Sequence, residues 1–446
     1  MLALFALLGC APPSAPGVDG DTSSEDGPEA STPDRVWTST RLGQASFGLQ
    51  ARMARSAEGT LAVAAYANNA EADGTCDDED GTTLQRQTIH VALRAPGGSW
   101  EVEQAAAPAV PLSPYGLDLS FDPAGRPAIA YAGGEPEDNW CGGHDAVLAV
   151  RDDATWTEQT AAMESDDAWS GDEASDAGFV VGLWPALAFD TQGHAALLYR
   201  DAHYGSIQHD DRIRSDAELA WSDGSAWSHQ VVDLGDGAQD YGDLAFDDDG
   251  RPVAAYAITV EATQDSRYGV WAARLEDGDW SHVQLYAGGI HTEVALALSP
   301  ATGLPSVAFY AQREEAAVVV TLADDGAFAD PDAWTTERVA TPGYDEGRNV
   351  ALAFDETGEP ALAYHRCRRA TSAGTDCDLN DEAAVFASRH EGSWVYETVA
   401  TGSLGSCGDQ TALAFDTDGR PHVFYRCLVE QDGDYALWPF VATPEG

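Results

Sequence analysis

The chain contains no lysine. Its 23 basic residues, all arginine, stand against 75 aspartates and glutamates, so the 446 residues carry a formal net charge of −52. Such a surface repels phosphate, which excludes nucleic acid as a partner, and it disfavours direct docking on anionic lipid headgroups. Yet 44% of the residues are hydrophobic and 13 are tryptophan, more than a chain kept disordered by its charge contains. We therefore expect a folded, acidic protein.

Short motifs that mark common catalytic sites are also lacking. The sequence has no G-x-S-x-G nucleophile turn, no H-E-x-x-H metal-binding helix and no Walker phosphate loop. It has no C-x-x-C pair either, which disfavours a zinc site. We expect no resident cofactor and no defined metal site, although the acidic surface could bind Ca²⁺ diffusely.

No apolar run is long enough to span a bilayer. Residues 2–8 form a short apolar segment typical of an export signal, and the stretch Leu7-Leu8-Gly9-Cys10 resembles the lipobox of bacterial lipoproteins. The resemblance implies a signal peptide at 1–9, a lipid on Cys10 and an outer-membrane location; an ordinary cleaved signal is the alternative. Residues 10–33 are rich in Pro, Gly, Ser and acid, and we expect a flexible tether before a domain at 34–446.

A motif of the form L-A-F-D-x-x-G-x-P-x-x-A-Y recurs along this domain. Its turn glycines are Gly59, Gly125, Gly193, Gly250, Gly303, Gly358 and Gly419, which lie 53 to 68 residues apart. On both sides of each turn, apolar and small residues alternate as in a β-hairpin, and two further runs of this kind follow. Four short strands in a repeat of about 60 residues are typical of a propeller blade.

Tryptophans test this interpretation independently. The fourth run of the first six repeats opens with Trp100, Trp156, Trp227, Trp280, Trp334 and Trp394. Repeat seven ends after its third run, whereas Trp37 stands ahead of repeat one. We therefore predict an all-β, seven-bladed β-propeller of four-stranded blades, closed by the N-terminal strand completing the last blade. Arg52 and Asp118 occupy small-residue positions of adjacent blades, and we expect them to form a buried ion pair.

Six cysteines follow Cys10, an even number that favours disulfides in an exported protein. The positions of these cysteines in the repeats favour the pairs Cys76–Cys141, Cys367–Cys377 and Cys407–Cys427. The main alternative joins Cys367 to Cys427.

Long loops enter the first strand and leave the second strand of each blade, and all of them share one face of the expected ring, where binding usually occurs. On that face we place Trp140 and Trp169. The innermost positions around its mouth are Gln50, Gly116, Trp184, Tyr241, Glu293, Asn349 and Gln410. Aromatic rings beside amides and carboxylates suit a sugar. The alternative is that the aromatics pack the loops onto the blades.

Three arginines follow second strands or nearly so: Arg200, Arg366 and Arg426. Converging guanidinium groups could bind a carboxylate; alternatively each arginine pairs with a nearby acid. His203 and His209 share an acidic loop with no recognised metal spacing. The D-x-D-G segments at 247–250 and 416–419 resemble the start of a calcium loop, but their positions in the hairpins favour structural turns.

The repeats resemble those of exported bacterial propellers grouped with sialidase-like, BNR-type proteins, over nearly all of residues 35–446. The resemblance implies the fold alone, because the S-x-D-x-G-x-x-W box of sialidases is absent and the three arginines only echo their arginine triad. We expect a surface-tethered, non-catalytic monomer that binds a glycan or an envelope protein at its long-loop face. A sialidase-like glycoside hydrolase is the alternative, and a structural envelope component is a third possibility.

Overall fold

A computed structural model describes the chain from residue 35 to residue 445. The gaps in this description are residues 46, 69–74, 78–82, 86, 108–115, 135–144, 164–177, 179, 203–214, 235–237, 259–266, 325, 342–343, 369–381, 403, 405 and 432. Contacts divide the chain into a unit Met1–Pro33, outside the described residues, and a unit Asp34–Gly446. No helix in the described part is long and apolar enough to cross a membrane.

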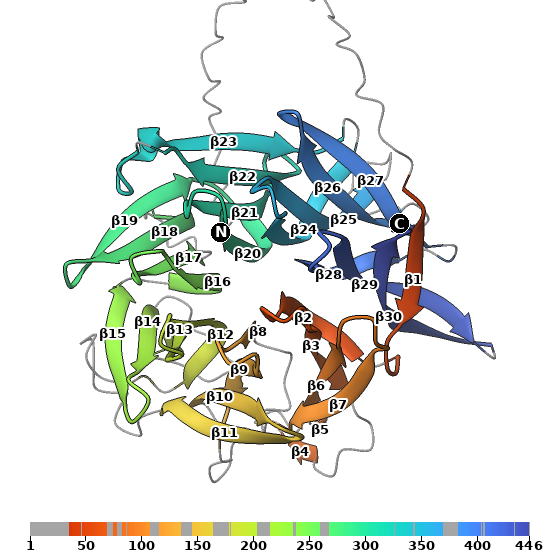
Figure 1. The fold of residues 1–446 in the computed structure, drawn as a ribbon, viewed down its shortest axis with the longest axis horizontal. Coiled ribbons are helices and arrows are strands. Elements are labelled where there is room, and N and C mark those ends of the chain that lie inside the picture. Colours follow the sequence, from red (N-terminus) through yellow and green to blue (C-terminus); the bar gives the residue numbers. More distant parts are fainter. Residues whose placement is uncertain are drawn as a thin grey trace, which may run out of the picture. The chain divides into compact units, whose positions relative to one another are not determined.

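Seven four-stranded antiparallel sheets surround a common axis (Figure 1). Blade 1 consists of β2 (Phe47–Arg55), β3 (Leu61–Asn68), β6 (Gln87–Arg94) and β7 (Glu101–Ala106). Blade 2 consists of β8 (Leu117–Phe121), β9 (Pro127–Gly133), β10 (Asp145–Asp152) and β11 (Thr155–Ala162). Blade 3 consists of β12 (Val180–Phe189), β13 (Ala195–Ala202), β14 (Ser215–Ser222) and β15 (Trp227–Asp233). Blade 4 consists of β16 (Ala238–Phe246), β17 (Pro252–Ile258), β18 (Gly269–Glu276) and β19 (Asp279–Tyr286).

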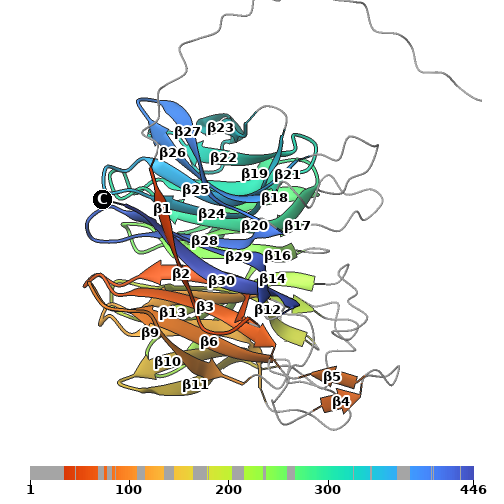
Figure 2. The ribbon, with the colours of Figure 1, turned by 90° about the vertical axis from the view of Figure 1, so that its right-hand side faces the viewer.

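The remaining blades follow the same order. Blade 5 consists of β20 (Ile290–Leu298), β21 (Pro305–Ala311), β22 (Ala316–Leu322) and β23 (Trp334–Val339), preceded by the 3₁₀ turn η3 (Pro331–Ala333). Blade 6 consists of β24 (Tyr344–Phe354), β25 (Pro360–Arg368), β26 (Ala383–His390) and β27 (Ser393–Thr401). Blade 7 consists of β28 (Cys407–Phe415), β29 (Pro421–Gln431), β30 (Asp434–Pro444) and β1 (Trp37–Arg41). A two-stranded hairpin of β4 (Thr75–Asp77) and β5 (Thr83–Gln85) stands off the ring after β3 (Figure 2).

The N-terminal strand closes the ring as predicted. β1 pairs antiparallel with β30, from Trp37 opposite Pro444 to Arg41 opposite Phe440, so strands from the two ends of the chain lie side by side in Figure 1. Four strands of blade 7 thus come from two distant segments, and no blade is left with three. The seven-bladed propeller closed by its N-terminal strand is confirmed.

Each Asp/Gly hairpin turn is held by its own aspartate. In blade 2, Asp122 Oδ1 accepts the backbone N–H groups of Ala124 at 3.0 Å and Arg126 at 2.8 Å, while Gly125 has φ 78°. The same pair of bonds recurs at Asp190, Asp247, Asp355 and Asp416. The turn interpretation of 247–250 and 416–419 is therefore confirmed. No cluster of three or more potential metal-ligating side chains occurs in the described part of the chain.

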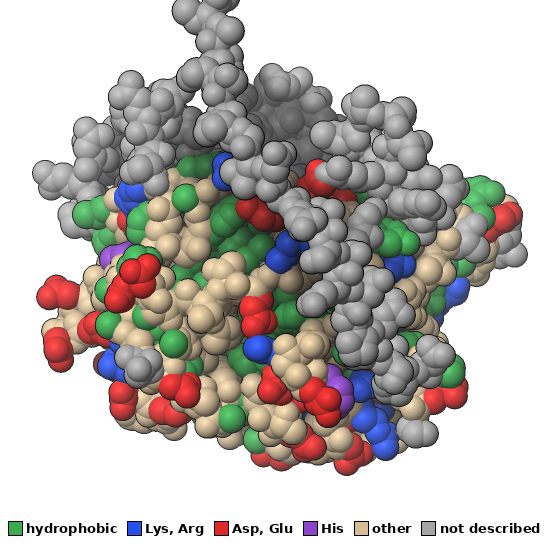
Figure 3. All heavy atoms as spheres, turned by 90° about the horizontal axis from the view of Figure 1, so that it is seen from above, with side chains coloured by type: hydrophobic (Ala, Val, Ile, Leu, Met, Phe, Trp, Pro, Cys, Tyr) green, Lys and Arg blue, Asp and Glu red, His purple; other side chains and the backbone are tan. Residues whose placement is uncertain are grey.

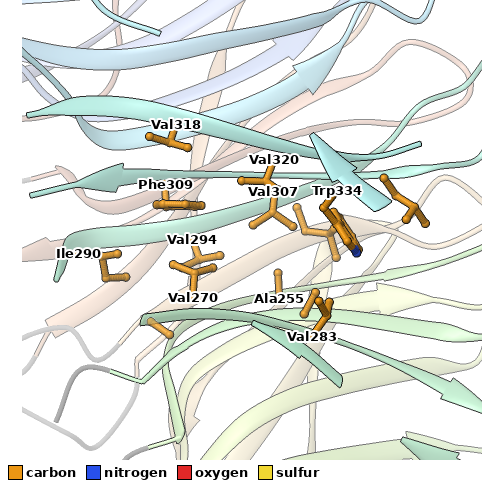
Figure 4. Close-up of a cluster of buried hydrophobic side chains, with 14 of the residues drawn as sticks. Ala255, Val270, Val283, Ile290, Val294, Val307, Phe309, Val318, Val320 and Trp334 are labelled. Carbon is orange, nitrogen blue, oxygen red and sulfur yellow. The ribbon is translucent and has the colours of Figure 1, made fainter. Parts of the chain in front are cut away.

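Facing sheets bury branched and aromatic side chains between them. Between blades 4 and 5, Val270 and Val283 of one sheet meet Val294, Val307 and Phe309 of the next (Figure 4). Alanines alternate with these large residues along the inner strands and let neighbouring sheets approach closely. The small-and-large alternation of the repeats therefore sets how tightly the blades crowd around the axis.

A buried tyrosine ends or nearly ends the second strand of every blade, and its hydroxyl has a partner. Tyr199 donates to Glu218 at 2.7 Å, and Tyr310 donates to Asp345 at 2.7 Å. Burial, with the neighbouring carboxylate, raises the pKa of Tyr310 to about 12. The repeated tyrosine is therefore a structural anchor.

The repeated tryptophans join neighbouring blades. Trp156 of blade 2 donates its indole N–H to Glu103 of blade 1 at 2.8 Å, and Arg151 donates to the same carboxylate at 2.6 Å. Equivalent groups of tryptophan, glutamate and arginine recur at two other interfaces, as Trp394, Glu337, Arg389 and as Trp37, Glu397, Arg35. We call these three groups the inter-blade latches. The glutamates were not anticipated from the sequence.

One of the predicted disulfides is confirmed. Cys407 bonds to Cys427 across the β28–β29 pair, which excludes the alternative pairing of Cys367 with Cys427. Cys367 is also disulfide-bonded. Cys10, Cys141, Cys377 and the side chain of Cys76 lie outside the described residues, so the other two pairs stay predictions.

Candidate functional site

The innermost strand of each blade departs from regular geometry near its start. The register between first and second strands shifts at this place in six blades, for example between Leu49 and Arg52 in blade 1. A shift of this kind is a β-bulge, and it turns a side chain out of the regular sheet pattern. Six of the seven predicted mouth positions lie at these shifts, on the strands nearest the axis (Figure 1), and the seventh, Gly116, directly precedes β8 of blade 2.

Six of the seven mouth residues adopt a left-handed backbone conformation. They are Gln50 (φ 53°), Gly116 (φ 80°), Trp184 (φ 46°), Tyr241 (φ 55°), Asn349 (φ 52°) and Gln410 (φ 58°), and Glu293 occupies the bulge of blade 5. We call these seven residues the bulge ring. A positive φ is uncommon outside glycine and costly for a bulky residue, and such strain concentrates at functional sites.

Neighbouring members of the bulge ring touch on its aromatic side. The rings of Trp184 and Tyr241 lie 5.7 Å apart at 61°. A Cβ atom at Gly116 would lie 2.7 Å from the Cα atom of Trp184, closer than real contacts allow. Glycine at this position therefore permits Trp184 to take its place.

The other side of the bulge ring is built from amides and one carboxylate. Asn349 Nδ2 donates to Glu293 Oε2 at 3.3 Å, and the backbone N–H of Gln50 donates to Gln410 Oε1 at 2.7 Å. The Thr411 hydroxyl donates to the carbonyl of Asn349. Gln50 Oε1 is buried and accepts no hydrogen bond from the described residues. These bonds hold the amides in fixed orientations across blade boundaries.

Exposure divides the bulge ring into supporting and accessible residues. Trp184 is only 7% exposed, with Glu293 at 5% and Asn349 at 9%. Gln50, Tyr241 and Gln410 are half-buried. A ligand at the mouth would therefore meet one phenol ring and two amides, while Trp184 supports Tyr241 from behind. At this exposure the indole packs against Tyr241, and its role in ligand binding stays a prediction.

Trp140 and Trp169 lie outside the described residues, as do His203 and His209, so their roles stay predictions.

The three arginines are each engaged within the fold. Arg426 pairs with Asp409, and Arg366 lies 4.0 Å from Glu346. Arg200 is fully buried, with its guanidinium 5.5 Å from the Trp184 ring centroid. Arg200 and Arg426 directly follow the strand-two tyrosine, whereas Arg366 comes one residue later and therefore faces the other side of its sheet. These neighbours differ from one arginine to the next, and the role of the three arginines in ligand binding stays a prediction.

On three innermost strands, a charged side chain follows the bulge-ring residue by two positions. Arg52 Nε is 3.8 Å from Asp118 Oδ1, which confirms the predicted pair. Asp118 Oδ2 accepts the backbone N–H of Leu187 at 2.6 Å, and Asp243 Oδ2 accepts that of Leu296 at 2.7 Å. Both donors belong to the innermost strand of the next blade. The carboxylates therefore satisfy N–H groups at sheet edges that would otherwise lack a partner.

Burial dominates the electrostatics of these acids. It raises the pKa of Asp118, and burial together with the charge of Asp118 raises the pKa of Asp243 to about 7. Arg52 acts in the opposite direction on both acids. The cluster holds two carboxyl groups and one arginine, and the raised pKa values mean that additional negative charge is disfavoured there.

Comparison with known proteins shows similarity in fold. No protein-family model matches the chain, and no curated protein matches it. A polysaccharide lyase, a PL25 ulvan lyase, is 12% identical with a TM-score of 0.53, covering 90% of this chain and 95% of its own. A protein of unknown function from Dyadobacter fermentans is 10% identical with a TM-score of 0.50, covering 91% and 98%. The NanB sialidase from Streptococcus pneumoniae is 11% identical with a TM-score of 0.44, covering 91% and 70%.

The likenesses to the ulvan lyase and to the Dyadobacter fermentans protein show similarity in fold alone. At 10% to 12% identity they transfer no site residue to this chain.

Proposed function

We propose that this protein is a surface-tethered, non-catalytic binding propeller that recognises a glycan at the mouth lined by the bulge ring. The observation that carries the proposal is the left-handed conformation of six ring positions, among them a tryptophan and a tyrosine. The fold maintains this strained conformation around the mouth, and strain of this kind is typical of binding sites.

The accessible side chains have the chemistry that a sugar requires. The ring of Tyr241 offers an apolar surface to the C–H face of a pyranose, and Gln50 and Gln410 offer amides to its hydroxyls. Among proteins of similar fold are polysaccharide lyases, one of them solved with -[GlcA(1-4)Rha3S]- bound. That example supports a carbohydrate, ahead of an envelope protein, as the ligand class for a mouth of this architecture.

Glycoside hydrolysis is the second candidate, and one observation favours it. Asp118 and Asp243 influence each other's protonation, and the pKa of Asp243 is raised to about 7, as a general acid requires. Each of the two carboxylates already accepts hydrogen bonds from two backbone N–H groups. These bonds give both acids a structural role, so we favour binding over catalysis as the function of the protein. Release of aryl alcohol from aryl glycosides by the wild type, and its loss in Asp243→Asn, would establish hydrolysis.

For its location we propose an outer-membrane lipoprotein, exported and anchored through Cys10, that acts as a monomer. The disulfide between Cys407 and Cys427 supports an oxidising compartment. Replacing Cys10 by alanine should move the protein from the membrane fraction to the soluble fraction. Equal membrane association of both forms would contradict the lipid anchor.

The binding test uses the full chain on a panel of immobilised glycans, with Ca²⁺ and again with EDTA. We expect saturable binding that Tyr241→Ala reduces at least tenfold and EDTA leaves unchanged. Tyr435→Ala is the matched control, because Tyr435 is 60% exposed and lies outside the bulge ring. Absence of binding to every glycan, or equal losses in the two variants, would refute a glycan site at the mouth.

A further inference from the structure

Positive charge around the mouth is matched by acids on the same blade. Arg426 pairs with Asp409, the residue before Gln410, and Arg348, the residue before Asn349, pairs with Asp345 at 3.0 Å. Arg366 Nε lies 4.0 Å from Glu346 Oε1. Among the described residues, these three arginines beside the mouth are therefore already neutralised by acids.

Beneath the mouth two carboxyl groups accompany one arginine, and their burial already disfavours negative charge. Asp118 and Asp243 share one arginine, Arg52, and burial together with Asp118 raises the pKa of Asp243 to about 7. Acidic side chains also spread over the described surface at the side of the ring, with arginines between them (Figure 3), and the whole chain carries a charge of −52. An approaching anion is repelled at long range, and at the mouth it finds no uncompensated cation among the described ion pairs.

We propose that the mouth selects sugars that carry no carboxylate or sulfate, taking neutral or amino sugars instead. This inference rests on the proposed function and names its ligand class. A buried anionic group would lose its hydration without gaining a cationic partner, which is costly. A hydroxyl, in contrast, exchanges bonds to water for bonds to Gln50 and Gln410, and an ammonium group is favoured by the acids beneath.

The experiment compares glycans that differ only in charge. The full chain is titrated with lactosamine with and without terminal sialic acid, with dextran and dextran sulfate, and with glucosamine oligomers, at 150 mM NaCl. The expected result is binding of at least one neutral or amino member, at least tenfold tighter than its anionic counterpart. If the anionic members bind as tightly as the neutral members or more tightly, the proposed charge selection is wrong, but the proposed glycan site is still supported. Failure of every member to bind overturns both.

A variant that liberates an arginine tests the cause of the selection. In Asp409→Asn, Arg426 loses its partner, and affinity for the anionic members should rise at least threefold. Asp418→Asn is the matched control, because it removes the same charge from the turn at the other end of the β28–β29 hairpin, where Asp418 is 69% exposed. Asp345→Asn, which releases Arg348, provides a second variant if Asp409→Asn folds poorly. Folded variants that bind anionic sugars no better than the control overturn the argument.

Discussion

The strain in the bulge ring can be measured at Gln50. Its φ of 53° costs a residue with a Cβ about 1–2 kcal/mol, whereas glycine adopts this conformation freely. Glycine gains about 0.5–1 kcal/mol of extra entropy in the unfolded chain. The side-chain oxygen of Gln50 accepts no hydrogen bond from the described residues, and its backbone N–H keeps Gln410 Oε1 as acceptor. Gln50→Gly should therefore stabilise the protein by about 0.5–1 kcal/mol.

Two companion variants separate strain from side-chain contacts. Gln50→Ala removes the same side chain but keeps the strain, so it should be about 1 kcal/mol less stable than Gln50→Gly. Gln410→Gly relieves a similar strain at φ 58°, yet it deprives the Gln50 N–H of its acceptor at 2.7 Å. An unsatisfied buried donor costs about 1–3 kcal/mol, so Gln410→Gly should be destabilising.

The assay is urea unfolding followed by tryptophan fluorescence, supported by thermal melts in which 1 kcal/mol corresponds to roughly 2 °C. Equal stability of the glycine and alanine variants at position 50 would show that the left-handed conformation stores no strain. Stabilisation by Gln410→Gly would show that the hydrogen bond from the Gln50 N–H to Gln410 Oε1 does not contribute to the free energy of unfolding. Either result would refute the reasoning on which the bulge ring is proposed as the site.

Three further predictions concern stability and pH. Gly116→Ala should destabilise the protein by at least about 2 kcal/mol in urea unfolding, because its Cβ would lie 2.7 Å from the Trp184 Cα atom at a φ of 80°; a neutral effect would contradict the close approach. Glu337→Ala should cost about 1–3 kcal/mol by leaving the indole N–H and the arginine of its latch without their carboxylate, and a melt unchanged from the wild type would show the latch to be inert. The folded state holds the Asp243 proton until about pH 7, whereas the unfolded chain releases it near pH 3.8. Protonated Asp243 therefore contributes to the free energy of unfolding below pH 3.8, and this contribution is lost as the pH rises from 3.8 to about 7. Asp243→Asn should therefore gain stability relative to the wild type between pH 5 and pH 7, by at most about 3 kcal/mol, and a difference that does not change with pH would contradict the raised pKa.

Much of the fold could be predicted because the same residue types recur at the same positions of the repeats. Asp122 and its equivalents hold a hairpin turn, the tyrosines anchor the second strands, and the tryptophans reach the preceding blade. Trp37 could be assigned to the last blade since every other fourth strand has a tryptophan near its start. The turn aspartate occurs in five blades, and the tyrosine and the tryptophan occur in all seven, so a single sequence displays these patterns repeatedly.

Contacts between blades could not be predicted in the same way. Glu103 of blade 1 accepts from Trp156 and Arg151, which lie about 50 residues further along the chain. Glu103 follows its own repeat tryptophan by three residues, as Glu337 and Glu397 do, but this spacing does not indicate a partner in the next blade. Asp118 stood out as a charge among small residues, and its pairing with Arg52 could be expected on that ground. Its bond to the backbone of Leu187 could not, because an edge N–H group leaves no trace in the sequence.

The bulge ring shows which part of the repeat is constrained by the fold and which part is not. The tyrosine and the tryptophan keep their residue types in all seven repeats, and the turn position holds aspartate in five blades and serine in two. At the mouth the backbone conformation recurs in six blades, yet five residue types occupy it, namely glutamine, glycine, tryptophan, tyrosine and asparagine. Glycine would meet the conformational requirement at every position with the least strain. The side chains there are consequently retained for what they contact, and Tyr241, Gln50 and Gln410 remain accessible to a ligand.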